Sequence, residues 1–193
     1  MLRFRPSSER SLPNPPHPYS LSKTLQVLIA QCWPALYGLD VVVAEPSNLI
    51  GPGKSQGLCA LLARYTVAAE EAAEAGSPVP VFRLSSRHER RDYLDVRDAM
   101  AAYETLLQGG VSGELYPVAS ERLITIEQLA ERFEALARSP LSFEIGDSAA
   151  PSPEPVDASG VRSLGWSPGI PLEQSIADTL HDARTKHASQ GGE

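Results

Sequence analysis

The run Leu39-Asp40-Val41-Val42-Val43-Ala44 constrains the fold most, because it is short, mostly apolar and β-branched at its centre. Such a run is typical of a parallel strand that is covered on both faces. It follows directly on a segment from Tyr19 to Tyr37 whose apolar residues recur at the spacing of a helix buried on one face. A helix that leads straight into a buried strand indicates an α/β fold.

The rest of the chain alternates in the same way and supports the α/β class. Asn48 to Gly53 predicts a tight turn, and Thr125 with Gln128 three residues later predicts a capping box. Further helices are expected at 58–75, 97–107, 125–137 and 172–186, and further strands at 80–84, 92–96, 114–118 and 141–145.

Composition excludes several function classes. The formal net charge of −7 over 193 residues argues against nucleic-acid binding, which needs clustered Lys and Arg. No apolar run is long enough to span a membrane, and Met1 to Pro6 lacks the apolar stretch of a signal peptide. Cys32 and Cys59 are too few for a disulfide framework or a zinc site, and no other metal site is indicated. We expect a cytoplasmic protein.

Tyr19 and Lys23 are the first candidate for chemistry, because a spacing of four places them on one face of a helix. A tyrosine ordinarily has a pKa of about 10, and a neighbouring cation favours its phenolate form. The pair therefore suggests a general acid/base tyrosine that is poised by a lysine. The alternative is a chance pair on a surface helix.

Five segments in order resemble landmarks of the extended short-chain dehydrogenase/reductase family, of the NAD-dependent epimerase/dehydratase, sugar-nucleotide type. They cover most of the chain, and the nearest branches are sugar-nucleotide epimerases, 4,6-dehydratases and 4-keto reductases. The segments are Pro15 to Lys23 (a proline-rich loop before Tyr-x-x-x-Lys), Val41 to Gly53 (a strand, an Asn and a Gly-Pro-Gly loop), Arg90 to Asp98, Gly113 to Tyr116, and Leu164 to Pro168.

The resemblance implies a role for four residues. Tyr19 would exchange a proton with a sugar hydroxyl, and Lys23 would contact the nicotinamide ribose of NAD or NADP and favour the phenolate, so both also count as cofactor-binding. Asn48 and Arg91 would contact a nucleotide diphosphate sugar, since the arginine fork can donate to two oxygens at once. From the residues alone, Asn48 is equally explained as a turn residue and Arg91 as part of a charged surface. Asp95 and Asp98 are interpreted as structural caps and Trp166 as core packing.

The resemblance also implies an architecture: the C-terminal part of a Rossmann-type doubly wound sheet with a small α/β substrate-binding region. The expected divisions are a proline-rich loop (1–18), a Rossmann-type remnant with the Tyr-x-x-x-Lys helix (19–57), a mainly substrate-binding region (58–188) and a tail (189–193). The family binds its dinucleotide on a glycine-rich strand-turn-helix that this sequence lacks. Gly51-Pro52-Gly53 comes nearest, but its proline has no N–H. We expect the chain alone to bind the cofactor poorly and to be inactive.

Three hypotheses stay open. The chain is part of an enzyme, either truncated by a late start site or completed by a second polypeptide that supplies the missing Rossmann half. The unpaired strand at residues 39–44 would favour self-association or binding of such a partner. It is a catalytically silent remnant that binds a nucleotide sugar or a protein. Or it is an unrelated α/β interaction domain.

Overall fold

The computed structural model describes residues 18–149 and 154–190. The proline-rich loop predicted for residues 1–18 therefore lies, up to residue 17, outside the described residues. The chain divides into two compact units. The small unit comprises Met1–Val43 with Val111–Leu115, and the large unit comprises Ala44–Gly110 with Tyr116–Glu193.

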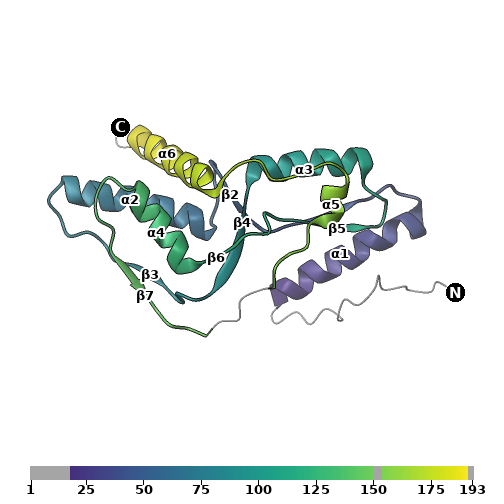
Figure 1. Ribbon diagram of the computed structural model, residues 1–193, viewed down its shortest axis with the longest axis horizontal. Coiled ribbons are helices and arrows are strands. Elements are labelled where there is room, and N and C mark those ends of the chain that lie inside the picture. Colours follow the sequence, from purple (N-terminus) through teal and green to yellow (C-terminus); the bar gives the residue numbers. More distant parts are fainter. Residues whose placement is uncertain (1–17, 150–153, 191–193) are drawn as a thin grey trace. The chain divides into compact units, whose positions relative to one another are not determined.

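The small unit consists mainly of helix α1 (Pro18–Tyr37), which agrees with the predicted helix (Figure 1). The helix ends at Gly38, whose φ of 66° suits glycine and whose N–H donates to Pro34 O at 3.0 Å. None of the residues of α1 is buried, although the sequence predicted one buried face. Large apolar side chains therefore stay exposed along it: Leu21, Leu25, Ile29, Trp33 and Leu36.

The strand predicted at residues 39–44 begins later, as β1 (Val43–Pro46). The Val41 N–H donates to the side chain of Ser112 at 3.1 Å instead of to a strand backbone. From Val43 onward, β1 pairs with β5 (Leu115–Val118), and its residues are partly exposed, so the predicted burial on both faces is wrong. Backbone contact with the segment before β5 nevertheless includes Val41, whose O accepts the Gly113 N–H at 2.7 Å.

The large unit contains two further small sheets. In the first, β2 (Asn48–Ile50) pairs parallel with β4 (Arg90–Asp95), and β4 pairs antiparallel with β6 (Leu123–Thr125). In the second, β3 (Phe82–Leu84) pairs parallel with β7 (Phe143–Ile145). The tight turn predicted from Asn48 is therefore wrong in its first half, because Asn48 starts a strand and the turn follows Ile50.

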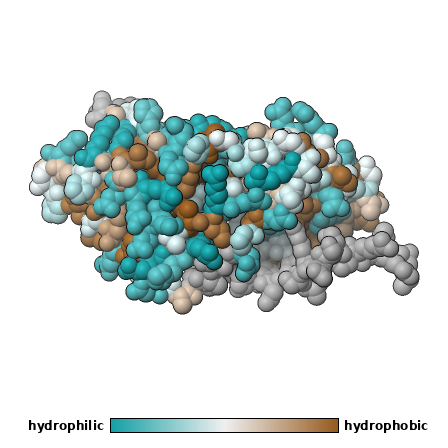
Figure 2. Space-filling model, in the orientation of Figure 1, coloured by the Kyte–Doolittle hydropathy of each residue, from teal (hydrophilic) through white to brown (hydrophobic). Residues whose placement is uncertain are grey.

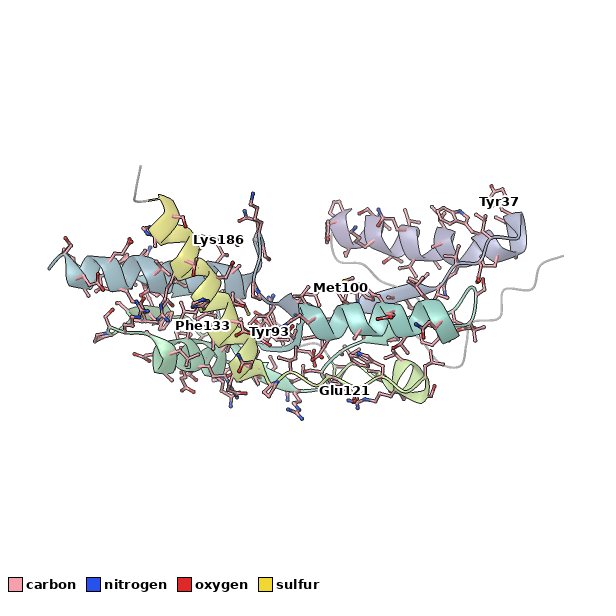
Figure 3. All side chains as sticks on the ribbon, turned by 90° about the horizontal axis from the view of Figure 1, so that it is seen from above. Tyr37, Tyr93, Met100, Glu121, Phe133 and Lys186 are labelled. Atoms are coloured by element: carbon pink, nitrogen blue, oxygen red, sulfur yellow. The ribbon has the colours of Figure 1, made fainter. Side chains whose placement is uncertain are left out.

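The core of the large unit lies between helices and the first sheet. The large unit contains the helices α2 (Leu58–Glu74), α3 (Val96–Gly109), α4 (Ile126–Leu136), α5 (Ser159–Ser163) and α6 (Leu172–Gln190). Side chains from α2, α4, α6 and β4 pack together, and Figure 3 labels Phe133 and Tyr93 among them. The fully buried members of this cluster are Leu62, Leu129, Phe133, Ile176 and Leu180.

Local signals from the sequence are confirmed at several helix ends. Thr125 and Gln128 form the predicted capping box of α4. Asp95 caps α3 by accepting the Arg97 N–H at 2.8 Å. Trp166 is buried as predicted, and its indole N–H donates to Asp98 O at 3.0 Å. Asp98 lies within α3 and accepts the N–H groups of Gly169 and Ile170, so it is structural without capping its own helix.

On the face shown in Figure 2, hydrophilic residues cover much of the surface and hydrophobic residues form scattered patches between them. In the part of the chain that the structure describes, none of the helices has the length and apolar character needed to cross a bilayer.

Candidate functional site

Tyr19 and Lys23 lie one turn apart at the start of α1, as the sequence predicted. Lys23 Nζ lies 5.6 Å from the centre of the Tyr19 ring, within the range of a cation–π interaction. The ammonium also donates to Gln26 Oε1 at 3.1 Å, and Tyr19 is 68% exposed. The geometry places a cation beside a phenol that a ligand can reach.

Asn48 lies at the start of β2, beside Tyr93 in the register of β4. Its Nδ2 donates to Asp92 O at 2.9 Å, which fixes the amide and commits one of its donors to the backbone. Because a carbonyl oxygen is the acceptor of that bond, Asn48 Oδ1 must point elsewhere. Asn48 can therefore offer its oxygen as an acceptor to a hydroxyl group.

Arg91 lies on β4 and forms an ion pair with Glu89, two residues earlier on the same strand face. Its Nε and Nη2 both donate to Glu89 Oε1, at 2.9 and 2.6 Å. The Arg91 side chain remains 39% exposed, whereas that of Glu89 is 12% exposed. These bonds use two of the five N–H donors of the guanidinium, so an anion could still be bound by the rest.

Asp92 is buried and holds three segments together, a role that the sequence did not single out. Its carboxylate accepts hydrogen bonds from Ser47 Oγ at 2.5 Å, from the N–H and Oγ of Ser120, and from the Arg122 N–H. Since its backbone oxygen also binds Asn48, Asp92 sets the position of the strand start that carries Asn48.

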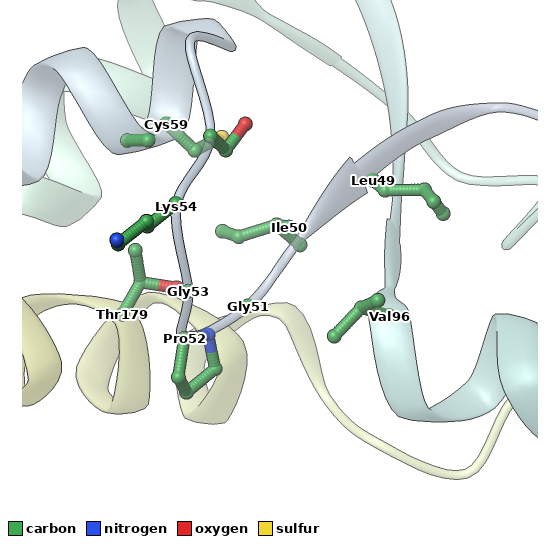
Figure 4. Close-up of a pocket in the computed structure, with 11 residues that line it drawn as sticks. Leu49, Ile50, Gly51, Pro52, Gly53, Lys54, Cys59, Val96 and Thr179 are labelled. Atoms are coloured by element: carbon green, nitrogen blue, oxygen red, sulfur yellow. The ribbon is translucent and has the colours of Figure 1, made fainter.

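A pocket of about 240 Å³, here called the loop pocket, opens beside the Gly-Pro-Gly segment that follows Asn48 (Figure 4). Gly51 is required there, because a Cβ on it would lie 2.5 Å from Val96 Cγ1. The lining residues are Leu49, Ile50, Gly51, Pro52, Gly53, Lys54, Ser55, Cys59, Ala60, Val96 and Thr179.

The chemistry of the loop pocket is that of binding rather than of proton transfer. Lys54 supplies a cation, while burial raises the pKa of the Cys59 thiol to about 12 and so keeps it protonated. The lining set holds no carboxylate and no histidine, so it lacks a general acid/base pair. The pocket can accommodate hydroxyl groups or an anionic group.

The same loop does not fit a dinucleotide pyrophosphate. Pro52 has no N–H to donate, and the Gly53 N–H already donates to Asp182 Oδ2 at 3.1 Å. A carboxylate at that position would also repel a pyrophosphate. Within residues 18–149 and 154–190, no group of three or more His, Cys, Asp and Glu side chains could hold a metal ion.

The four predicted residues thus form two pairs: Tyr19 and Lys23 in the small unit, and Asn48 and Arg91 on neighbouring strands of the large unit. Sequence reasoning missed Lys54, although its position directly after Gly-Pro-Gly was a usable signal. It could not have found Thr179, which reaches the loop pocket from α6 near the other end of the chain.

Comparisons with known proteins identify related sequences. The family model described as "NAD dependent epimerase/dehydratase family" matches residues 3–119. GDP-6-deoxy-D-mannose reductase of Pseudomonas aeruginosa is 30% identical over 183 residues, which cover 92% of this chain and 59% of that protein. dTDP-glucose 4,6-dehydratase of Streptomyces niveus is 28% identical over 186 residues, covering 93% of this chain and 52% of that protein.

Solved structures give the same result for the fold. RMD from Pseudomonas aeruginosa, in complex with NADPH, matches with a TM-score of 0.81 and 28% identity over 95% of this chain and 61% of that chain. dTDP-glucose 4,6-dehydratase from Bacillus anthracis, in complex with NAD, matches with a TM-score of 0.73 and 22% identity. The match covers 97% of this chain and 58% of the dehydratase chain. The predicted Rossmann-type α/β class is confirmed, and the chain spans about half to three fifths of the length of these proteins.

Proposed function

The chain belongs to the NAD dependent epimerase/dehydratase family, and we propose that it supplies the acid/base and substrate-binding portion of an NAD(P)-dependent sugar-nucleotide epimerase, dehydratase or reductase. The observation that carries the proposal is the position of Lys23 over the ring of Tyr19 at the start of α1. This position places a cation one helical turn from the phenol that is the acid/base group in this proposal.

In this proposal, Tyr19 exchanges a proton with a hydroxyl of the sugar, and Lys23 contacts the nicotinamide ribose. Asn48 accepts a hydrogen bond from the sugar through Oδ1, because its Nδ2 is committed to Asp92 O. Arg91 binds the diphosphate with the donors that Glu89 does not use. The nicotinamide of NAD or NADP would supply the hydride chemistry of the complete family enzyme.

We also propose that the uncovered face of α1 binds a second protein surface, either another copy or a polypeptide with a glycine-rich dinucleotide fold. Leu25 and Ile29 are 48% and 54% exposed, and Lys23 is the single charged residue of the helix. If the occupant is another copy, replacing both apolar residues by Ser should shift the chain to a smaller species in light scattering, and an unchanged mass would contradict self-association. A cytoplasmic location stays a prediction.

A second candidate is a catalytically silent remnant that binds a nucleotide sugar. It is favoured by the occupied Gly53 N–H, which leaves the loop without a pyrophosphate cradle. The two candidates differ in turnover and agree in substrate binding.

Calorimetry with GDP-mannose, dTDP-glucose and UDP-glucose tests the shared part. We expect at least one to bind, Arg91→Ala to weaken it tenfold or more, and Arg83→Ala to leave it unchanged. Arg83 is a matched control, because it also pairs with a glutamate on a strand. Binding that Arg91→Ala does not weaken, or no binding at all, would refute the assignment.

Turnover separates the two candidates. Oxidation or reduction of a bound sugar nucleotide with added NAD(P)(H), lost in Tyr19→Phe, supports the enzyme portion. Binding of the sugar nucleotide without any response to the dinucleotide supports the silent remnant.

A further inference from the structure

A second pocket lies in the large unit and contains none of the residues assigned above, although its Tyr93 and Ile124 pair in register with Asn48 and Arg91. Its volume is about 260 Å³, and we call it the arginine pocket. Its wall comes from β4, the segment between β5 and β6, α4 and the start of α6. The lining residues are Tyr93, Ser120, Arg122, Ile124, Arg132, Pro168, Gly169, Ile170, Pro171, Leu172 and Glu173.

Two arginines from different elements supply its charge. Arg132 donates from Nε to Glu173 Oε1 at 3.0 Å and from Nη1 to Gln128 O at 3.1 Å. Among the described residues the guanidinium of Arg122 has no hydrogen-bond or ion-pair partner, but its charge, like that of Arg132, helps to lower the pKa of Glu173. With Glu173 as the one acidic residue of the lining, the wall carries an excess of one positive charge.

Two aspartates outside the lining fix the backbone of the pocket wall. Asp92 fixes the N–H groups of Ser120 and Arg122, and Asp98 fixes those of Gly169 and Ile170. Neither aspartate is among the lining residues, and the carboxylates of both are engaged by these bonds. The arginines therefore project from segments whose backbone is fixed before any ligand arrives.

One further feature favours an acceptor-rich ligand. Pro171 and Leu172 open α6, so the pocket meets the amino end of a 19-residue helix, where the helix dipole favours negative charge.

We propose that the arginine pocket binds the phosphate group of a small phosphate monoester. Arg122 and Arg132 would grip the phosphate, since guanidinium groups match its oxygens. The pocket volume of about 260 Å³ equals that of several water molecules at about 30 Å³ each, which is more than a phosphate group alone would fill. Ile124, Ile170 and Leu172 offer apolar contact to the carbon body of the ester. The chain carries a net charge of −7, so general attraction of anions would not explain such binding.

Calorimetric titration of the intact chain with glucose 1-phosphate and with inorganic phosphate tests the proposal. We expect the ester to bind more tightly than inorganic phosphate. Arg122→Ala and Arg132→Ala should each weaken binding of the ester tenfold or more. Glu173→Gln should strengthen it severalfold, because it removes the opposing charge and frees Arg132.

Two control variants separate this site from other cations of the chain. Arg83→Ala, in an exposed pair, and Lys54→Ala, in the loop pocket, should leave affinity for glucose 1-phosphate unchanged. Absence of binding, binding that survives Arg122→Ala, or binding lost in Lys54→Ala would overturn the proposal. Binding of inorganic phosphate alone would contradict the ester.

Discussion

The buried pair Glu70 and Arg184 provides a quantitative test of the large unit. Glu70 is 5% exposed and belongs to α2, and Arg184 belongs to α6. The guanidinium donates from Nε to Glu70 Oε2 at 3.0 Å and from Nη2 to Oε1 at 2.5 Å. Glu70 Oε1 also accepts the Arg138 N–H at 2.9 Å, and Arg184 Nη2 donates to Leu136 O. The pair therefore ties α2, α6 and the end of α4 together.

Arg184→Ala should lower the free energy of unfolding by about 3 kcal/mol near neutral pH. Removing one partner of a buried pair costs about 3–5 kcal/mol, because a charge is left buried without compensation. The lower end of this range applies here, because the Arg184 side chain is still 21% exposed to solvent. Urea unfolding followed by circular dichroism measures the loss. Arg83→Ala is the matched control and should cost far less, because the Arg83–Glu144 pair is exposed at 81% and 63%.

The loss should also depend on pH. Burial alone would raise the pKa of Glu70, but the bonds from Arg184 and the Arg138 N–H outweigh it and hold that pKa below its usual value. A carboxyl with a lowered folded pKa stabilises the fold fully above its unfolded pKa of about 4.3, and the contribution disappears as pH falls through the folded value. The gap between wild type and Arg184→Ala should therefore narrow toward about pH 3.5. A loss under about 1 kcal/mol, or one equal at both pH values, would refute this reasoning.

Three further outcomes follow from single side chains. Because burial raises the pKa of Cys59 to about 12 while Cys32 is exposed, a thiol reagent should modify Cys32 alone in the native chain, and rapid reaction of both would contradict this. Gly51→Ala should cost about 1–3 kcal/mol in urea unfolding, because the new Cβ would meet Val96; an unchanged midpoint would show that the loop yields freely. Thr125→Ala should cost about 1 kcal/mol by removing the cap of α4, whereas Thr125→Ser should retain most of it.

The features that sequence predicted correctly are those that neighbouring residues decide. The capping box at Thr125, the cap at Asp95 and the Tyr19–Lys23 spacing all depend on helix geometry over three or four residues. By contrast, β6 (Leu123–Thr125) is too short for a detectable period, and it is a strand because β4 pairs with it. The later start of β1 depends on contacts with residues 112–114, far along the chain, which no local pattern of residues 39–44 could reveal.

The candidate site follows the same rule. Glu89 and Arg91 are two residues apart and so share a strand face, but the predicted strand began at residue 92, which hid the pairing. The anchoring of Asn48 by Asp92 and the meeting of Arg122 with Arg132 both depend on how distant segments pack. Residue types identified candidates, while tertiary contacts determined their partners.

If the uncovered face of α1 binds a second surface, as proposed above, the apparent stability of this chain depends on mass action. Any surface that docks on Leu25 and Ile29 binds the folded helix and not the unfolded one, so dilution should melt the small unit at a lower temperature. The Glu70–Arg184 pair lies within the large unit, and its contribution should not vary with concentration. Thermal melting at several protein concentrations would thus distinguish a part of the chain whose stability depends on association from a part whose stability does not.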